Sequence, residues 1–523
     1  MKFDDILEQQ VGEFGPYQKR IYVLVCLPAV AAAFLSLLPV FILTTPKHRC
    51  HIPGLDNDTY AIQSEYHLHL INISIPWEYD EHDRKWERSN CDLYTYGNDS
   101  KELEESPWME TDFNMVCDAS IYKYHFKMIT FFGSFCGAIL TGFLSDLYGR
   151  KLIFLSSLLA AVVVTLIQLV SPFLWIFLGT RFLQGVCGAG VFSVSFVYVM
   201  EIVGPNYRMF AGIFIEIFWC FGLFLLVGTA YLIHYWKYLV ATMSVPALFF
   251  FFYTWLIPES PRWLMSAGKY EHADKILQKI ARSNKRQLPS KLLEMTSMDE
   301  NSVEVKAESA KVWRILRHKV LFLRTLIIAF NRFVIDLGYY GISLNVDHLS
   351  GNLFINYTLS SAVETAGIVV VLLLISRLGR KPLYSGSMVI GALGFLLSTL
   401  PTFFGDDKDE EYSVGLVMVG KFGVSAAYAV IYVYCSEIFP TSVRSSAMAL
   451  MFICGMIGAV VSPYVVEISE SMSDPMRAAF PMLVFGSSSL AAALLSLLLP
   501  ETKDKNMPDN IDDIANQAYE TRI

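Results

Sequence analysis

The chain alternates between long apolar stretches and short polar connections over most of its length. A helix needs about 20 apolar residues to cross the hydrocarbon core of a bilayer, so stretches of that length predict membrane spans. Twelve such stretches occur, at approximately residues 21–45, 122–145, 152–170, 173–202, 209–232, 237–257, 321–345, 353–376, 382–404, 412–436, 443–468 and 478–499. The pattern therefore predicts an all-α membrane protein with twelve transmembrane helices.

Composition agrees with this pattern. The 523 residues are 54% hydrophobic and only 17% charged, and the mean hydropathy is +0.42. A chain of this size and polarity is typical of a polytopic membrane protein and not of a soluble one. The net charge of −8 indicates little about partners, because the distribution of charge among the loops carries the information.

Basic residues lie in alternate connections between the predicted spans. They are Lys19, Arg20, Arg150, Lys151, Arg208, Arg377, Arg380, Lys381 and Arg444. The opposite connections are neutral or acidic, as in FGDDKDEEY at 404–412. The positive-inside rule then predicts that both termini are cytoplasmic. The polar, acidic start MKFDDILEQQ does not resemble a cleavable signal peptide, and the first span is long enough to remain in the membrane.

A first polar insertion, residues 46–121, is expected on the outer side. It contains three acceptor sequons for N-glycosylation, at Asn57, Asn72 and Asn98. It also contains three of the nine cysteines, Cys50, Cys91 and Cys117. We expect a disulfide among them, with the third cysteine free or paired elsewhere.

A second polar insertion, residues 258–320, is expected in the cytoplasm. Its stretch KYEHADKILQKIARS has apolar residues at helical spacing, which predicts a short amphipathic helix against the inner face. The predicted organisation is a cytoplasmic N-terminus (1–20), a first six-helix half (21–257), this linker (258–320), a second six-helix half (321–499) and a cytoplasmic tail (500–523).

Three segments of the first half recur in the second. LSDLYGRK (144–151) returns as LISRLGRK (374–381), MEIVGPNYR (200–208) as SEIFPTSVR (436–444), and IPES (257–260) as LPET (499–502). Repeats in the same orientation predict two six-span halves that rock against each other around a site near the middle of the membrane. The repeat thus indicates transport by alternating access.

The repeated segments also predict a gating network at the inner ends of the spans. Its candidate residues are Asp146, Gly149, Arg150, Lys151, Glu201, Arg208, Arg380, Glu437 and Arg444. The glycines permit tight turns, and Asp146 is expected to accept hydrogen bonds from a neighbouring helix N-terminus. Topogenic charge alone would explain the basic residues but not the acids.

Several of these segments resemble a known family. GFLSDLYGRK (142–151), RFLQG (181–185), PESPRWL (258–264) and PETKDKNMPDNIDD (500–513) are similar to signature segments of the major facilitator superfamily. FDDILEQQVGEFGPYQ (3–18), the long outer loop, GYYGISLN (338–345) and YVYCSEIFPTSVR (432–444) resemble the organic cation and carnitine transporters within it. The resemblance covers nearly the whole chain. It implies a uniporter or exchanger of small organic ions, with a pocket lined by the first, fourth, fifth, seventh, eighth, tenth and eleventh spans.

Seven of the ionisable residues inside the predicted spans are candidates for a special role. They are Arg181, Glu216, Arg332, Asp336, Glu364, Lys421 and Glu467. Burying a charge at the centre of a bilayer costs about 2.5 to 3.5 kcal/mol even on the mildest scale, so each needs a partner or a water-filled cavity. Glu467 lies at the outer end of its span and is expected to face water. Structural hydrogen bonding between helices and a part in transport are equally supported for Arg181 and Lys421.

Glu364, eleven residues into the eighth span, is the first candidate for binding a cation. By resemblance it matches an acidic residue of the cation and carnitine carriers. A carboxylate in a cavity of low dielectric attracts a cation more strongly than it would in water. The alternative is a neutral carboxylic acid bonded to a backbone carbonyl. Glu216 in the fifth span is a second candidate, although a position near the cytoplasm is equally consistent with its place in the sequence.

Arg332 and Asp336 are one helical turn apart, which leaves two interpretations open. They can pair with each other and be structural. Alternatively, Asp336 and Glu364 can bind an ammonium group while Arg332 binds a carboxylate. Aromatic residues suited to cation–π contacts lie nearby in the sequence or on neighbouring spans: Tyr339, Tyr340, Phe192, Tyr428, Tyr432 and Tyr434.

The chain also departs from the family pattern. It has Arg332 where the cation carriers have an aromatic residue, Met456 where they have an acid, and Ser376 at the position that repeats Asp146. These departures make a carnitine-like or betaine-like zwitterion a competing substrate.

The sequence predicts a polyspecific secondary transporter of small organic cations in the plasma membrane, working by facilitated, electrogenic or exchange transport. Alternatives are a transporter of zwitterions or of organic anions, or a ligand sensor on the same fold. The patterns GxxxxGK[ST], HExxH and CxxC and the nucleophile elbow do not occur. We therefore expect no enzyme activity, cofactor, metal or nucleic-acid partner, whereas the sequence does not define an oligomeric state.

Overall fold

The structure is a computed structural model. It describes residues 3–43, 48–52, 55, 61–74, 77–80, 85–88, 94–96, 113, 115, 117–171, 173–286, 319–404, 410–439, 444–473 and 475–503. Three predicted features, the sequons at Asn57 and Asn98 and the cysteine Cys91, lie outside these residues, as do the side chains of Cys50 and Cys117.

Each of the six spans predicted in the first half is helical. The first consists of α2 (Pro16–Cys26), α3 (Pro28–Leu37) and α4 (Pro39–Ile42). It is interrupted at Pro28 and Pro39, because proline has no N–H group to donate. The next four are α7 (Ile121–Tyr148), α8 (Arg150–Val170), α9 (Leu174–Ile202) and α10 (Pro205–Leu232). The sixth consists of α11 (Trp236–Ala247), η3 (Leu248–Phe252) and α12 (Tyr253–Leu256).

The second half follows the same plan. Its helices are α17 (Lys319–Ser343), α18 (Leu353–Leu378), α19 (Arg380–Phe404), α20 (Glu410–Ile438), α21 (Arg444–Glu470) and α22 (Met476–Ser496). A short helix, η4 (Val346–His348), follows α17. Among the described residues, 11 segments are long and apolar enough to cross a membrane. The twelfth predicted span, α17, has a similar length but carries Arg324, Arg332 and Asp336, which lower its hydropathy.

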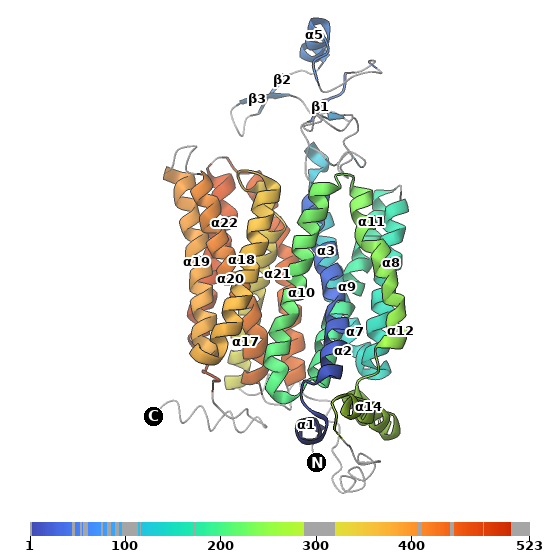
Figure 1. Cartoon of the computed structure of the whole chain (residues 1–523). Coiled ribbons are helices and arrows are strands. Elements are labelled where there is room, and N and C mark those ends of the chain that lie inside the picture. Colours follow the sequence, from blue (N-terminus) through green and yellow to red (C-terminus); the bar gives the residue numbers. More distant parts are fainter. Residues whose placement is uncertain are drawn as a thin grey trace.

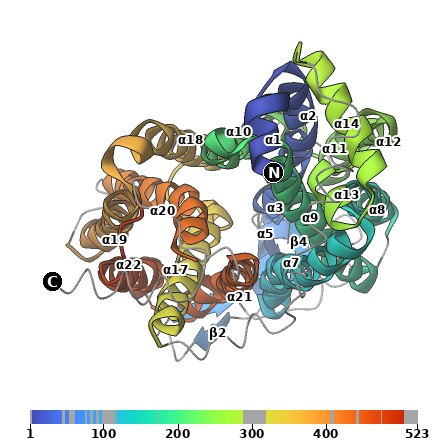
Figure 2. The ribbon, with the colours of Figure 1, turned by 90° about the horizontal axis from the view of Figure 1, so that it is seen from below.

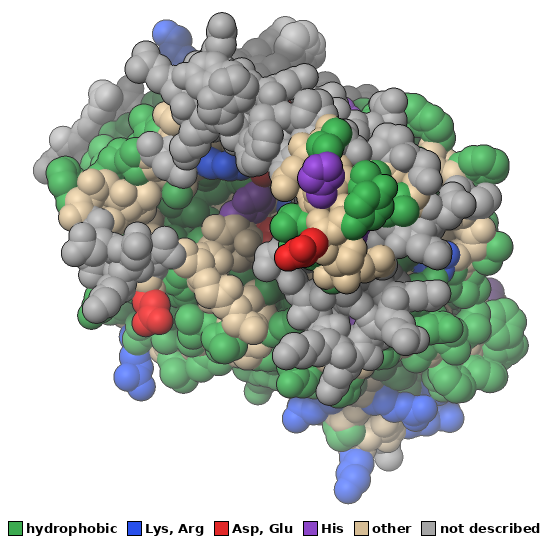
Figure 3. Space-filling model, turned by 90° about the horizontal axis from the view of Figure 1, so that it is seen from above, with side chains coloured by type: hydrophobic (Ala, Val, Ile, Leu, Met, Phe, Trp, Pro, Cys, Tyr) green, Lys and Arg blue, Asp and Glu red, His purple; other side chains and the backbone are tan. Residues whose placement is uncertain are grey.

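The long helices stand side by side in one bundle (Figure 1), and from below they form two groups, α2–α12 and α17–α22 (Figure 2). Large hydrophobic side chains such as Phe143, Ile167 and Leu373 are exposed on the spans, as expected for contact with lipid. Seen from above, hydrophobic side chains lie around the rim of the bundle (Figure 3). Small residues permit close packing: a side chain at Gly185 would overlap the α7 backbone, and one at Gly423 would overlap the α19 backbone.

The two ends of the bundle differ. We call the end that carries α1 (Phe3–Ile6) the terminal face, and the opposite end the loop face (Figure 1). The loop face carries α5 (Glu65–Ser74) and four short strands. β1 (His48–Cys50) pairs antiparallel with β4 (Tyr94–Tyr96), and β2 (Trp77–Asp80) with β3 (Lys85–Arg88). Asn72, the described sequon residue, is exposed on α5.

Short helices cover the first half at the terminal face. The predicted amphipathic helix is present as α14 (Tyr270–Ser283), and it follows α13 (Pro261–Ser266). Its apolar residues Leu277 and Ile280 pack against Ile6 and Leu7, from α1 and η1 (Leu7–Val11). The N-terminal segment is therefore docked on the linker helices by the apolar faces of both.

Candidate substrate-binding cavity

A cavity lies between the two halves, with about 1310 Å³ of empty space when the solvent-filled space at its mouth is included. Residues of α3, α9, α10, α17, α18, α20 and α21 line it, which matches the spans that the family resemblance implied. Residues of α7, α8 and α11 line it as well. The helices α19 and α22 do not contribute to the lining.

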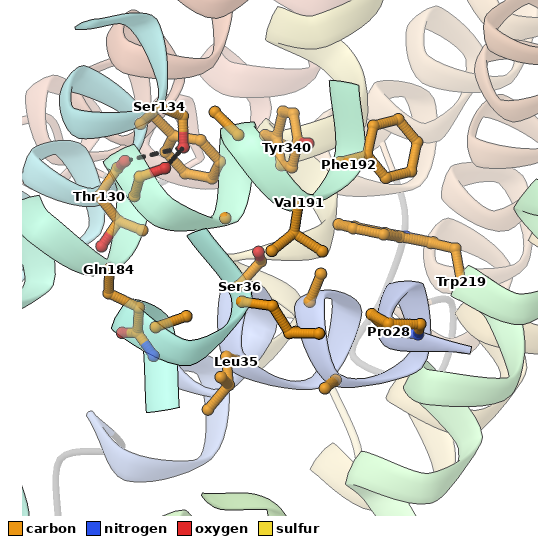
Figure 4. A pocket seen from close by; sticks show the side chains of 18 of the residues that line it. Pro28, Leu35, Ser36, Thr130, Ser134, Gln184, Val191, Phe192, Trp219 and Tyr340 are labelled. Carbon is orange, nitrogen blue, oxygen red and sulfur yellow. Dashed lines mark hydrogen bonds between the residues drawn. The ribbon is translucent and has the colours of Figure 1, made fainter. Parts of the chain in front are cut away.

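Aromatic rings form a large part of the lining. Figure 4 shows Phe192, Trp219 and Tyr340 on one side of the cavity, and Leu35 and Gln184 on another. The rings of Phe192 and Trp219 meet edge to face, with centroids 5.9 Å apart. Tyr339 and Tyr428 also line the cavity, whereas two other predicted aromatics, Tyr432 and Tyr434, do not.

Two carboxylates line the cavity, one from each half. Glu216 lies on α10 and Glu364 on α18. Glu216 is only 7% exposed, and no hydrogen bond or ion pair to its side chain is found within the described part of the chain. A carboxylate in this position is available to a ligand in the cavity.

Glu364 is held in a network of buried groups. Its Oε1 accepts a hydrogen bond from the Tyr339 hydroxyl at 2.7 Å, and that hydroxyl accepts one from Trp219 Nε1 at 2.9 Å. Its Oε2 lies 3.3 Å from the Lys421 ammonium on α20. Cys220 Sγ is 3.9 Å from Oε1. The alternative interpretation, a neutral acid bonded to a backbone carbonyl, does not match this geometry, because Glu364 lies beside an ammonium and accepts from a hydroxyl.

Arg332 and Asp336 form an ion pair, with Nε and Oδ2 2.9 Å apart and both side chains fully buried. The guanidinium lies over the rings of Tyr428 and Tyr432, 4.1 and 4.7 Å from their centroids. Its Nη2 donates to the Tyr432 hydroxyl at 3.0 Å. Neither charged residue is part of the cavity lining, so this geometry matches the structural interpretation of the pair.

The remaining ionisable residues of the spans lie outside the lining as well. Arg181 is fully buried with its guanidinium 4.4 Å from the Phe126 ring centroid, and it donates to Gln184 Oε1 at 2.7 Å. Its Nε and Nη2 find no hydrogen-bond partner among the described residues. Glu467 is half-buried near the loop-face end of α21.

The repeated turns at the terminal face form two matching clusters. After Gly149, which has φ of 107°, the N–H groups of Arg150 and Lys151 both donate to Glu259 Oε1 at 3.0 Å. Arg150 also forms ion pairs with Glu201 at 3.0 Å and with Asp146 at 2.8 Å.

The second cluster repeats the first with different chemistry at one position. After Gly379, with φ of 93°, the N–H groups of Arg380 and Lys381 donate to Glu501 at 3.0 Å. Arg380 pairs with Glu437 at 2.7 Å. Ser376 stands where the first half has Asp146.

One expectation about these clusters is corrected. The acceptor at the helix N-terminus is Glu259 and not Asp146, whose side chain is 72% exposed and bonded to Arg150. Arg208, another gating candidate, pairs at 2.5 Å with Asp4 of the docked N-terminal segment. The sequence contained a signal for the acceptors Glu259 and Glu501, because their segments IPES and LPET recur at matching places. The sequence alone could not show which turn each glutamate contacts, since the two lie far apart in the chain. The side chain of the remaining gating candidate, Arg444, lies outside the described residues.

The two halves also meet directly. Toward the loop face, Lys127 donates to Asn345 Oδ1 at 2.8 Å, and His125 Nδ1 and the Tyr464 hydroxyl are 2.9 Å apart. Toward the terminal face, Arg380 Nη2 lies 3.8 Å from Met209 Sδ. Sequence reasoning missed these contacts, because the partners Asn345, Tyr464 and Met209 carry no charge that would mark them.

A membrane-spanning bundle of two repeated halves around a shared cavity defines a transporter of the major facilitator fold. The family model described as "Sugar (and other) transporter" matches residues 61–509. The chain is 34% identical to the "Organic cation transporter protein" of Drosophila melanogaster over 99% of this chain and 95% of that one. It is 30% identical to "Solute carrier family 22 member 13" of Homo sapiens over 97% of this chain and 92% of that one. The chain belongs to the organic cation transporter family of the major facilitator superfamily.

Solved structures agree on the fold. The proton:xylose symporter XylE bound to 6-bromo-6-deoxy-D-glucose matches with a TM-score of 0.65 at 18% identity, over 95% of this chain and 99% of that one. The predicted all-α fold of this superfamily is thus confirmed.

Proposed function

We propose that this protein carries small organic cations across the plasma membrane by alternating access of the cavity between its halves. The observation that carries the proposal is the cavity lining, which joins aromatic faces to carboxylates from both halves, Glu216 and Glu364. The names of the relatives, organic cation transporters among them, point to the same class of substrate. The protein acts as a transporter and not as an enzyme.

The lining suits a cation that cannot donate hydrogen bonds. Aromatic faces attract alkylammonium groups by about 0.5 to 2 kcal/mol each, without directional bonds. Phe192, Trp219, Tyr340 and Tyr428 supply such faces. The Glu216 carboxylate, which has no ion-pair partner among the described residues, adds a charge in a region of low dielectric, where its attraction for a cation exceeds that in water.

Polyspecificity follows from the same features. Aromatic faces and a carboxylate select a ligand by its size and by the sign of its charge. A network of directional hydrogen bonds would instead select for one molecule. The large, mainly apolar cavity can accept cations that differ in shape.

The orientation we propose has the terminal face in the cytoplasm. The basic turns Gly149–Lys151 and Gly379–Lys381 support it, because positive charge favours the cytoplasmic side. The exposed Asn72 on the opposite side is then accessible to glycosylation. Transport requires the contacts Lys127–Asn345 and His125–Tyr464 to open when the cavity faces outward.

A zwitterionic substrate has less support. A carboxylate group would need a free cation in the cavity, and Arg332 is paired with Asp336 outside the lining. If the protein were a ligand sensor, the same cavity would bind the ligand but would not move it across the membrane.

The test is uptake of labelled tetraethylammonium, carnitine and para-aminohippurate in cells that express the protein. We expect time-dependent, saturable uptake of the cation, reduced at least tenfold in Glu216→Gln and in Glu364→Gln at equal amounts of protein on the surface. Uptake of carnitine or of para-aminohippurate without uptake of tetraethylammonium would contradict the proposal. Equilibrium binding of the cation without accumulation over time would favour the sensor.

A further inference from the structure

One of the two cavity carboxylates already has a cation of its own. The Lys421 ammonium lies 3.3 Å from Glu364 Oε2 and 3.4 Å from the centroid of the Tyr339 ring. It also donates to Ser343 Oγ. A carboxylate and an aromatic face around one ammonium are the contacts that the cavity would offer to an organic cation.

The position of Lys421 indicates that it approaches from behind the lining. Glu364 and Tyr339 line the cavity, whereas Lys421 does not and is fully buried. The lysine thus neutralises the Glu364 carboxylate without filling the cavity. Glu364 is the acid with which Lys421 forms an ion pair among the described residues.

The other buried cations have contacts of their own outside the lining. Arg332 is paired with Asp336, and Arg181 lies over Phe126, all outside the lining. Glu216 is therefore the cavity carboxylate without an ion-pair partner in the described structure, and Glu364 is the compensated one.

We infer that Lys421 is the resident counter-cation of Glu364 and sets the charge of the substrate that the cavity accepts. With Lys421 in place the lining offers one uncompensated carboxylate, Glu216, and takes a monocation. Without Lys421 it offers two, one from each half, and takes a dication. This inference rests on the proposed function and names Lys421 as a positioning and specificity residue that does not itself touch the substrate.

The inference separates two roles for Glu364 that single substitutions confuse. If Glu364 binds the substrate directly, its loss is not repaired by any change at Lys421. If it serves mainly to neutralise Lys421, then Glu364→Gln fails because it leaves an unpaired ammonium beside the cavity, which repels a cation. Removing that ammonium as well should restore binding, because Glu216 remains.

The experiment compares Lys421→Met, Lys421→Arg, Glu364→Gln and the double variant Glu364→Gln/Lys421→Met in the full chain. It measures uptake of labelled tetraethylammonium and its inhibition by a bis(trimethylammonium) alkane, with surface protein quantified for each variant. The quantity compared is the ratio of two half-inhibitory concentrations, that of the dication divided by that of unlabelled tetraethylammonium. We expect Lys421→Met to lower this ratio at least tenfold. Lys421→Arg, which keeps the charge, should leave this ratio unchanged. The double variant should recover at least a third of wild-type uptake.

Two results would overturn the inference. One is a double variant that reaches the surface in wild-type amounts and stays inactive, which assigns substrate contact to Glu364. The other is a Lys421→Met variant with the wild-type ratio of inhibition. Should Lys421→Met not fold, the double variant, in which neither member of the Lys421–Glu364 pair is charged, decides alone. Failure of the proposed function is recognised separately, because wild-type protein would then take up no cation or Glu216→Gln would remain fully active.

Discussion

The two halves agree at the terminal face and differ in the charges that they bury. In both, a glycine turn presents two N–H groups to a distant glutamate, Glu259 in the first half and Glu501 in the second. In both, a buried tyrosine hydroxyl donates to a proline carbonyl at 2.7 Å, from Tyr198 to Pro258 and from Tyr434 to Pro500.

Deeper in the bundle the correspondence ends. The second half buries two ion pairs, Arg332–Asp336 and Lys421–Glu364. The first half has Arg181 at the place comparable to that of Lys421, held by an aromatic ring and an amide instead of an acid.

The comparison separates two tasks. In the mechanism that we propose, both halves form and release the same contacts as they rock, so their turns keep the same chemistry. In the same mechanism each half presents a different surface to the substrate, so the buried charges need not match. The following predictions test this division, beginning with the largest expected effect.

Arg332→Leu should lower the free energy of unfolding by about 3 to 5 kcal/mol, because it leaves the fully buried Asp336 carboxylate without its partner. Thermal unfolding of the purified protein measures the change. The double variant Arg332→Leu/Asp336→Leu should recover most of the loss. As a matched control, Lys275→Ala breaks the exposed pair with Glu271 at the same spacing and should cost only about 0.3 to 0.5 kcal/mol. A mild effect of Arg332→Leu on stability, combined with lost transport, would instead favour a role in binding.

Gly455→Ala should destabilise by about 1 to 3 kcal/mol, because the added methyl group would overlap the Asp336 carboxylate and the Arg332 side chain. The same thermal assay applies. Gly228→Ala is the control, since a methyl group there meets no atom within 4 Å. Equal melting temperatures for the two variants would indicate that α21 and α17 pack less closely than described.

Glu501→Gln should lower stability by about 1 kcal/mol, since the carboxylate caps the first N–H groups of α19. Burial by itself raises the pKa of the Glu501 carboxyl, but hydrogen bonds from Lys503, Arg380 and neighbouring N–H groups outweigh it, and the pKa lies below its ordinary value of 4.5.

A depressed folded-state pKa means that the stabilisation is complete above the ordinary value and is lost as pH falls through the folded-state value. Wild type and Glu501→Gln should therefore differ in melting temperature at neutral pH and converge in acid. Glu259→Gln, the matched change in the first half, should cost a similar amount at neutral pH. A difference between wild type and Glu501→Gln that persists in acid would contradict the capping role.

Ser376→Asp should have the smallest effect, a gain of about 0.3 to 0.5 kcal/mol. It would give Arg380 the partner one turn earlier that Asp146 gives Arg150. Asp146→Ser should cost a similar amount. The difference between the two melting temperatures checks whether the halves are interchangeable at this position, and a loss of stability in Ser376→Asp would show that they are not.

Much of the fold could be predicted from the sequence. The hydrophobic pattern gave the spans to within a few residues, because each helix must satisfy its own backbone hydrogen bonds in lipid and is therefore encoded locally. The repeat predicted two halves, and the amphipathic stretch predicted α14. The positions of the buried ionisable residues were equally plain, since charge stands out against an apolar background.

The partners of those residues were decided by the tertiary structure. Glu364 and Lys421 lie on different helices 57 residues apart, and Glu259 meets the turn of Gly149 across 110 residues. Which face of a helix meets the cavity and which meets another helix depends on how all the helices pack together. The sequence thus determined that charges are buried in the membrane. The packing decided that, within the described structure, Glu216 faces the cavity without an ion-pair partner while Glu364 is already paired.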